Sequence, residues 1–154
     1  MIKIAYRPDY VLPLPKGHKF PMDKYELVPR QLLHEGLFTE DHFFAPEAHA
    51  ETEVAAVHDH AYITKLKEKT LSRQEERRIG FPLSDALLRR EYMITNGTIQ
   101  AALYAKQYGA AFNIAGGTHH AFTNRGEGFC IFNDIAVAAR YLLDHDLAKK
   151  HIDY

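Results

Sequence analysis

The sequence is poor in the residues that build covalent cross-links and membrane spans. Its 154 residues include one cysteine, Cys130, and no tryptophan. A single cysteine excludes a disulfide within the chain and any zinc site made of several thiolates. No uninterrupted apolar run approaches the roughly 18 residues that span a bilayer, and the first ten residues lack the pattern of a secretory signal. These absences predict a cytoplasmic protein with no membrane partner.

Excess charge of either sign is also absent. Nineteen Lys and Arg residues stand against twenty Asp and Glu residues, which gives a formal net charge of −1. Proteins that bind nucleic acids through phosphate contacts usually carry a basic surplus, so we expect no direct nucleic-acid partner. Nine Phe and nine Tyr residues are too many aromatics for a disordered chain, and the length suits one domain. The sequence therefore predicts a single globular domain.

Hydrophobic patterning along the chain alternates between strands and helices. Short apolar or alternating runs predict strands over residues 2–6, 43–44 and 110–115, and the last of these reads as a parallel strand covered on both faces. Helical spacing and capping residues predict helices over residues 23–36, 59–71, 84–109 and from 133 onward. Gly97 lies inside the long helix, where it suggests close packing. Residues 48–57 fit either a strand or a short helix, and the charged run 72–78 fits a solvated face or loop. This order of elements indicates an α/β fold.

The most informative segment is Gly116-Gly117-Thr118-His119-His120-Ala121, directly after the last apolar strand. Two adjacent glycines permit a sharp turn, and ligands of α/β sheets bind at the carboxyl ends of the strands. Adjacent histidines can divide their work, one acting as a neutral base and the other as a charged acid or electrostatic stabiliser. The alternative is a pair of loop histidines with no catalytic role.

A second segment, Gly128-Phe129-Cys130-Ile131-Phe132-Asn133-Asp134-Ile135, follows shortly after. Together and in this order, the two segments resemble the GG-x-HHA and GFC-x-x-ND motifs of the zinc-dependent histone deacetylase family. Looser similarity, closest to the class IV and bacterial branch, continues at Pro15–Pro21 with His18, at Val57–Ile63 and at Gly80–Ser84. The resemblance implies the N-terminal part of a parallel-sheet arginase–deacetylase fold.

What the resemblance implies for single residues follows from the motif positions. His120 matches the general base and acid for a zinc-activated water, and His119 matches its electrostatic partner. Gly128 and Phe129 match residues that line the narrow tunnel for an acylated lysine. Asn133 and Asp134 match a structural pair, for which a helix N-cap is an equally good explanation.

The sequence departs from the family at the metal. The family's zinc ligands are an Asp and a His in a D-x-H on the next strand and a later Asp, and a Tyr polarises the substrate carbonyl. None has a counterpart here, and the His151-x-Asp153 pattern does not match in order or context. We therefore assign no metal ligand and expect this chain alone to bind no zinc. Residues 1–154 are interpreted as the N-terminal portion of one deacetylase-like domain that ends before the metal-binding strand.

Three functions are compatible with these observations. The first is a hydrolase that removes acyl groups from lysine or a small amine, with this chain inactive by itself. The second is a non-catalytic oligomerisation or scaffold unit, because a sheet edge left bare pairs readily with another chain; either way we expect a homo-oligomer. The third, a ureohydrolase of the arginase branch, is disfavoured because that branch has Asp between Gly-Gly and a single His, where this chain has Thr118 before two.

Overall fold

Three short parallel strands form the sheet on which the rest of the chain packs. A computed structural model describes residues 1–148. The strands are β1 (Lys3–Ala5), β2 (Phe43–Phe44) and β3 (Ala111–Asn113), in the order β2-β1-β3. In this register Ile4 of β1 lies opposite Phe43 on one side and Phe112 on the other. The predicted α/β class with a parallel sheet is confirmed.

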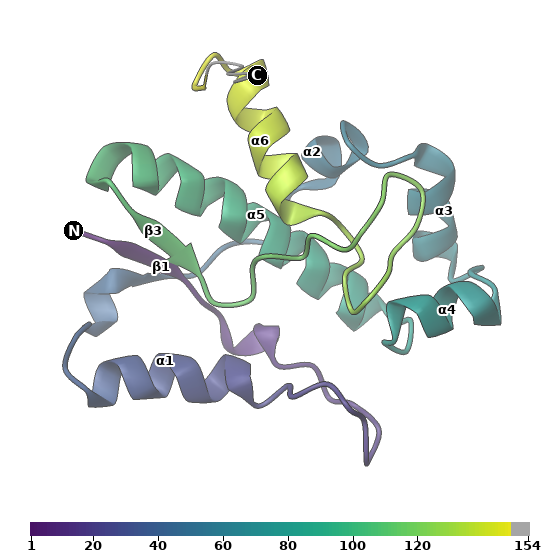
Figure 1. The fold of residues 1–154 in the computed structure, drawn as a ribbon, viewed down its shortest axis with the longest axis horizontal. Helices are drawn as coiled ribbons and strands as arrows, with labels where there is room; N and C mark the ends of the chain where they lie inside the picture. The colour runs from purple at the N-terminus through teal and green to yellow at the C-terminus, as the bar shows by residue number, and fades with distance from the viewer. Residues whose placement is uncertain (149–154) are drawn as a thin grey trace, which may run out of the picture.

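The remaining regular elements of the described chain are helices. They are α1 (Lys24–His34), α2 (Glu51–Ala55), α3 (His60–Glu68), α4 (Arg73–Ile79), α5 (Asp85–Tyr108) and α6 (Asp134–Asp144), with the 3-10 turns η1 (Pro8–Tyr10) and η2 (Glu40–His42). The long helix α5 packs against β1, β3 and α6 and so forms the spine of the molecule (Figure 1). Helices α3 and α4 lie toward the N-terminal end of α5, where the loop between β3 and α6 also passes (Figure 1). None of the helices described over residues 1–148 is both long and apolar enough to cross a membrane.

Of the two alternatives for residues 72–78, the loop is wrong and the solvated face is confirmed, because most of this run forms the helix α4 with its charged side chains exposed or half-buried. Ser72 and Glu75 make a capping box, in which Glu75 N donates to Ser72 Oγ at 3.3 Å and Ser72 N donates to Glu75 Oε2 at 2.7 Å. These hydrogen bonds and the nearby Lys65 lower the pKa of Glu75 to about 2. The helix then buries Ile79 at its end. The S-x-x-E pattern was the sequence signal for this helix, and the high charge of the run obscured it.

Two other predicted elements are shorter than expected. Helix α3 ends at Glu68, so Leu71 is buried from the following loop rather than from the helix. The strand predicted over residues 110–115 is confined to Ala111–Asn113. Asn113 faces α5, since its Nδ2 donates to Ile94 O at 2.8 Å, and the alternate residue Phe112 is 53% exposed. Cover on both faces is therefore not found, because α5 packs on one face of β3 only.

Close contact between α5 and the sheet depends on Gly97. A Cβ atom at this position would lie 2.7 Å from Tyr10 Oη and 3.0 Å from Asn113 Nδ2. Those two side chains are themselves joined, because Tyr10 Oη donates to Asn113 Oδ1 at 3.1 Å. The glycine thus brings the helix backbone onto a hydrogen-bonded pair, which confirms the close packing expected from the sequence.

A buried ion pair joins α5 to the N-terminal segment. Arg90 and Glu91 are 3% and 1% exposed, and Arg90 Nη1 lies 2.5 Å from Glu91 Oε1. Arg90 Nε also donates to Tyr10 O at 2.6 Å, and its guanidinium lies 5.0 Å from the centre of the Tyr25 ring. The pair therefore connects α5, η1 and α1. Removal of one partner would leave the other charge buried and uncompensated.

Replacement of Gly97 by Ala should destabilise the protein by up to about 2 kcal/mol. Alanine favours a helix by about 1 kcal/mol over glycine, but the added methyl group would crowd Tyr10 and Asn113, and overpacking costs about 1–3 kcal/mol. Urea unfolding followed by circular dichroism measures the difference. Gln100→Ala, on the same helix but only partly buried, is the control and should change stability little. A Gly97→Ala variant at least as stable as the parent would contradict the close packing.

Candidate active site

The tandem histidines lie in the turn that follows β3. His119 and His120 are both exposed, with ring centres 4.3 Å apart and ring planes inclined at 39°. The turn begins at Gly117, whose φ of +90° suits glycine, and Gly117 O lies 2.9 Å from His119 Nδ1. A carbonyl oxygen accepts only, so Nδ1 of His119 carries the proton and Nε2 remains available as an acceptor when the ring is neutral. The structure therefore places the two rings side by side at the carboxyl end of a parallel strand.

The carboxylate of Asp134 holds this turn in place. Asp134 is completely buried, and it accepts hydrogen bonds from Gly117 N at 3.0 Å and from Thr118 N at 2.7 Å. Its Oδ2 also accepts from Thr98 Oγ1 of α5 at 2.5 Å. Gly116 leaves room for this arrangement, since a Cβ there would lie 3.1 Å from Asp134 Oδ2. One buried carboxylate thus ties the glycine turn to α5 and to the start of α6.

Asn133, the N-cap of α6, also holds the histidine segment in place. Its Oδ1 accepts from Ala136 N at 3.0 Å, which is an N-cap hydrogen bond. Its Nδ2 donates to Ala121 O at 3.2 Å and to His119 O at 3.4 Å. The geometry of Asn133 and Asp134 accordingly favours the structural role, because both side chains bind the backbone of the histidine segment rather than the imidazole rings.

Gly128 and Phe129 follow His119 and His120, which we call the dyad, and hydrogen bonds to the backbone of α4 hold them in place. A Cβ at Gly128 would lie 3.4 Å from His120 Cγ, an ordinary van der Waals distance, so the glycine lies next to that ring with room for about one methyl group between them. Gly128 N donates to Arg78 O at 2.9 Å, and Phe129 N donates to Ile79 O at 2.7 Å. The structure therefore brings all four predicted site residues together.

Phe129 is part of an aromatic cluster that the site prediction did not include. Its ring centre lies 5.0 Å from that of Phe20, 5.2 Å from that of Phe81 and 6.1 Å from that of His18. His18 Nδ1 accepts from Phe20 N at 3.2 Å, and its Nε2 lies 2.8 Å from Gly80 O. We call His18, Phe20, Phe81 and Phe129 the aromatic wall. The segments Pro15–Pro21 and Gly80–Ser84 resemble the family, but their spacing in the sequence does not predict that they meet Phe129.

His58 is a further residue that the site prediction omitted. It is 3% exposed, its Nε2 accepts from Asn133 N at 3.0 Å, and its Nδ1 lies 3.2 Å from Thr123 O. This pairing requires the neutral ring with the proton on Nδ1. Burial lowers the pKa of His58 and so favours the same form. His58 therefore ties the loop between the two motifs to the helix pair α2 and α3.

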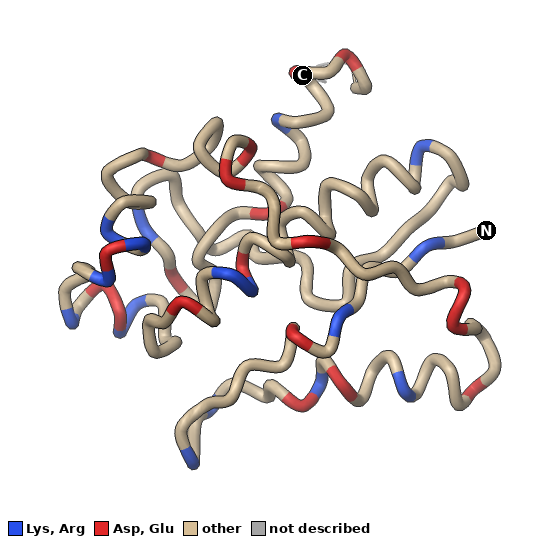
Figure 2. The backbone as a smooth tube through the Cα atoms, turned by 180° about the vertical axis from the view of Figure 1, so that it is seen from behind, with Lys and Arg blue, Asp and Glu red and all other residues tan. Residues whose placement is uncertain are grey.

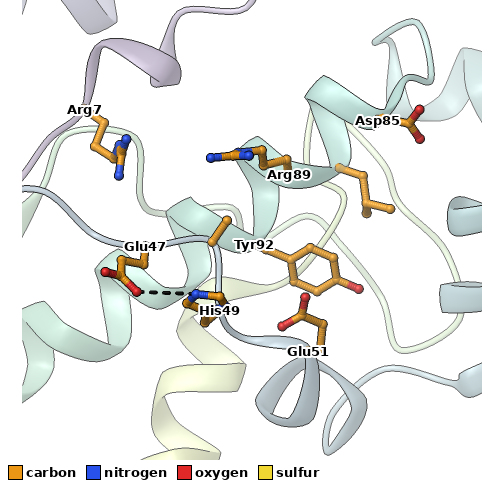
Figure 3. A pocket seen from close by; sticks show the side chains of 9 residues that line it. Arg7, Glu47, His49, Glu51, Asp85, Arg89 and Tyr92 are labelled. Carbon is orange, nitrogen blue, oxygen red and sulfur yellow. Dashed lines mark ion pairs between the residues drawn. The ribbon is translucent and has the colours of Figure 1, made fainter.

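A separate hollow of about 580 Å³ lies away from the dyad and is shown in Figure 3. Its polar lining comprises Arg7, Glu47, His49, Glu51, Asp85, Arg89 and Tyr92. Several of these charges already have partners: Arg7 with Asp9 at 3.0 Å, Glu47 with His49 at 3.4 Å and Asp85 with Lys69 at 2.6 Å. The hollow contains none of the four predicted site residues, and Arg7, Glu47 and Asp85 of its lining are already held in ion pairs. We therefore place the candidate chemistry at the dyad.

The residues around the dyad do not make a zinc site. Over residues 1–148, no three His, Cys, Asp or Glu side chains come together in a way that could hold a metal ion. The Asp134 carboxylate, which holds the histidine turn, already accepts hydrogen bonds from the backbone and from Thr98. A zinc site needs at least three protein ligands. The His151-x-Asp153 pattern lies outside the described residues.

Replacement of His58 by Gln should lower stability near pH 8 and should matter less in acid. The unfolded histidine has a pKa of about 6.5, and burial holds the folded pKa below that value. Between the two values the unfolded chain binds more protons, so the stability from His58 is present above about pH 6.5 and is lost as the pH falls toward the folded pKa. Urea unfolding across this range measures the gap between variant and parent.

The matched control is His34→Gln, because His34 is exposed on α1. Its effect should be small and independent of pH. A gap for His58→Gln that widens as the pH falls would contradict the neutral, buried state of His58.

Comparison with known proteins agrees with this geometry. The histone deacetylase domain family matches residues 18–153. An uncharacterized protein of Picosynechococcus sp. is 40% identical over 147 residues, which are 96% of this chain and 49% of that protein. Histone deacetylase 2 of Arabidopsis thaliana is 29% identical, over 91% of this chain and 38% of its own length. The chain thus spans about half or less of the curated relatives that it matches.

The fold matches a solved structure as well. The crystal structure of an HDAC homolog from Aquifex aeolicus superposes with a TM-score of 0.76 at 29% identity, over 94% of this chain and 41% of that one. The arginase–deacetylase architecture expected from the motifs is therefore confirmed. The chain belongs to the histone deacetylase domain family.

Proposed function

We propose that this chain provides the catalytic histidines and one wall of the acyl-lysine tunnel of a deacetylase. The observation that supports the proposal is the short distance between Gly128 and the His120 ring, since a Cβ at Gly128 would lie 3.4 Å from His120 Cγ and the next residue, Phe129, belongs to the aromatic wall. An amide hydrolase for acyl-lysine needs a proton carrier next to a narrow apolar channel. In this proposal His120 is the proton carrier and the aromatic wall forms part of the apolar channel.

His120 is the group that we propose moves the protons. It is exposed, and its ring forms no hydrogen bond to the part of the chain that the structure describes. A free imidazole can take a proton from the attacking water and return it to the departing amine. His119 lies within contact distance of the same ring, with its Nδ1 fixed by Gly117 O, so it is placed to influence the charge on His120.

The aromatic wall suits the aliphatic part of an acylated lysine. Phe129 and Phe20 present adjacent rings whose centres are 5.0 Å apart, and methylene groups pack well against such faces. Contact with these rings would remove water from the methylenes and hold the amide near His120. An acylated lysine, or a small acylated amine with a similar chain, is the proposed substrate.

The zinc that the family resemblance implies does not fit the described residues. They supply no set of three ligands, and zinc would polarise the scissile carbonyl in a complete site. We therefore propose that residues 1–154 are the N-terminal portion of one deacetylase domain and that this chain alone neither binds zinc nor turns over substrate.

A chimera tests the role of His120. Residues 1–148 are joined to the part of the Picosynechococcus relative that follows the aligned region, and release of acetate from an acetyl-lysine peptide is measured with zinc present. His120→Ala should lower kcat/KM by about 10²–10⁴-fold, the usual contribution of a general acid–base group. His34→Ala is the control, since His34 is exposed on α1, and it should leave the rate unchanged.

The isolated chain is the second control and should show no turnover. Hydroxamate-sensitive activity of the isolated chain would refute its proposed inactivity. A His120→Ala chimera as active as its parent, or a His34→Ala chimera equally impaired, would refute the assignment of the dyad.

A second function, self-association, is favoured by the bare edge of the sheet. Among the described strands, β3 pairs with β1 on one side only. Apolar side chains near it are exposed: Phe112 by 53%, Ile135 by 50% and Leu143 by 40%. Unpaired strand edges flanked by apolar surface tend to recruit another chain. We propose that copies of this chain associate through β3 and α6, with or without catalysis.

Light scattering over a range of concentrations should show a dimer or larger species. Phe112→Lys places a charge on the exposed face of β3 and should shift the mass toward the monomer. Leu37→Lys is the matched control, because Leu37 is 66% exposed in the loop after α1, and it should leave the mass unchanged. A monomeric parent chain at high concentration would rule out this association.

A further inference from the structure

A second hollow, of about 570 Å³, borders the aromatic wall. Its lining includes His18, Arg73, Glu76, Arg77, Gly80 and Phe81. Two of these residues, His18 and Phe81, belong to the aromatic wall itself. Their rings stack with centres 5.8 Å apart and planes inclined at 15°. The hollow therefore shares part of its surface with the proposed lysine channel.

Gly80 lies between the hollow and the proposed lysine channel. A Cβ at Gly80 would lie only 2.7 Å from Cε1 of Phe129. Gly80 lines the hollow, and Phe129 belongs to the proposed channel. The Phe81 and Phe129 ring centres are 5.2 Å apart. A ligand in the hollow would thus be separated from the channel by about one aromatic layer, which an extended peptide crosses within a few residues at about 3.3–3.6 Å per residue.

The charge of the hollow comes from one face of α4. Arg73 and Arg77 are one turn apart and exposed, and within residues 1–148 neither makes an ion pair with an acidic side chain. Glu76 stands between them and is likewise without a cationic partner in that part of the chain, so two guanidinium groups face one carboxylate. By contrast, the adjacent Glu75 is neutralised by Lys65 at 3.0 Å.

The loop beside the hollow adds positive charge. The loop between η1 and α1, residues 11–23, contains Lys16 and Lys19, which flank His18, and one acidic residue, Asp23, at the start of α1. Both lysines are exposed. The view from behind shows blue at the tip of this loop and alternating blue and red along α4 (Figure 2). Exposed cations therefore occur on α4, where Arg73 and Arg77 line the hollow, and on the loop that carries His18.

We propose that this hollow binds an acidic side chain, Asp or Glu, of the polypeptide that presents the acylated lysine. The proposal rests on the proposed function, because the aromatic wall would bind the acylated lysine while Arg73 and Arg77 would bind the carboxylate of the acidic side chain. A guanidinium group matches a carboxylate with two parallel hydrogen bonds. The preferred substrate is accordingly an acylated protein segment with an acidic residue a few positions from the lysine, rather than a free acylated amine.

Peptide binding to the intact 154-residue chain tests this site. Fluorescence anisotropy follows a labelled peptide that carries one acetyl-lysine with Glu residues on both sides. A second peptide has Gln in place of each Glu, and a third keeps Glu but has no acetyl group. Exposed ion pairs contribute little each, so the Glu peptide should bind about three- to tenfold more tightly than the Gln peptide for two such contacts. Added salt should reduce this preference.

The variant Arg73→Gln/Arg77→Gln should abolish the preference. The matched control Lys67→Gln/Arg89→Gln removes the same charge from exposed positions that do not line the hollow, and it should retain the preference. Circular dichroism verifies that both variants keep the helical content of the parent.

The outcomes separate this inference from the function on which it rests. Equal affinity for the Glu and Gln peptides, no measurable binding of either, or an equal loss in both double variants would overturn the acidic-residue site. If the Glu peptide binds equally well with and without its acetyl group, the acidic site stands and recognition of acyl-lysine by this chain is refuted.

Discussion

A buried carboxylate determines where the histidines stand. Asp134 has no exposed surface, and its two oxygens accept from the backbone of the glycine turn and from Thr98 of α5. Burial of an ionised group is costly unless donors replace the lost water, so the turn, α5 and α6 must keep their relative positions for Asp134 to remain satisfied. The glycines make this possible, because a side chain at Gly116 would approach the same oxygen. The rigid placement of His119 and His120 is a consequence of this network.

The long loop between β3 and α6 has almost no regular structure, yet it is attached at several points. Asp134 accepts hydrogen bonds from the beginning of the loop. His58 binds the middle of the loop at Thr123 O and its end at Asn133 N. Between these points, the carbonyl oxygens of Arg78 and Ile79 accept from Gly128 N and Phe129 N. Each attachment is a hydrogen bond to a backbone group of the loop. A long loop can thus be held in place without a strand or helix of its own, since polar groups of neighbouring elements supply the hydrogen bonds that a strand or helix would otherwise provide.

Much of the framework could be predicted because it depends on local signals. Ser84 and Gly109 bound α5 as expected, and the apolar run before Gly116 marks β3. The site could be predicted only in part. The motifs pointed to His119, His120, Gly128 and Phe129, but the contacts that hold them come from residues distant in the sequence, such as His58 and Thr98. Asn133 and Asp134 illustrate the limit: a cap and a buried anchor look the same in sequence, and only the packing around them distinguishes the two.

The backbone conformation of Phe129 links the shape of the loop to the width of the proposed channel. Gly128 and Phe129 have φ values of +58° and +67°, a region that suits glycine and is unfavourable for other residues, above all β-branched ones. A protein engineer who wished to admit a bulkier acyl chain could not simply trim Phe129 to valine, because the smaller side chain would resist this backbone conformation. Changes at Phe20 or Phe81 carry no such penalty, since neither has a positive φ. Within the aromatic wall of the proposed channel, the half-buried Phe20 is therefore the adaptable position, and Phe129 is held by its backbone conformation.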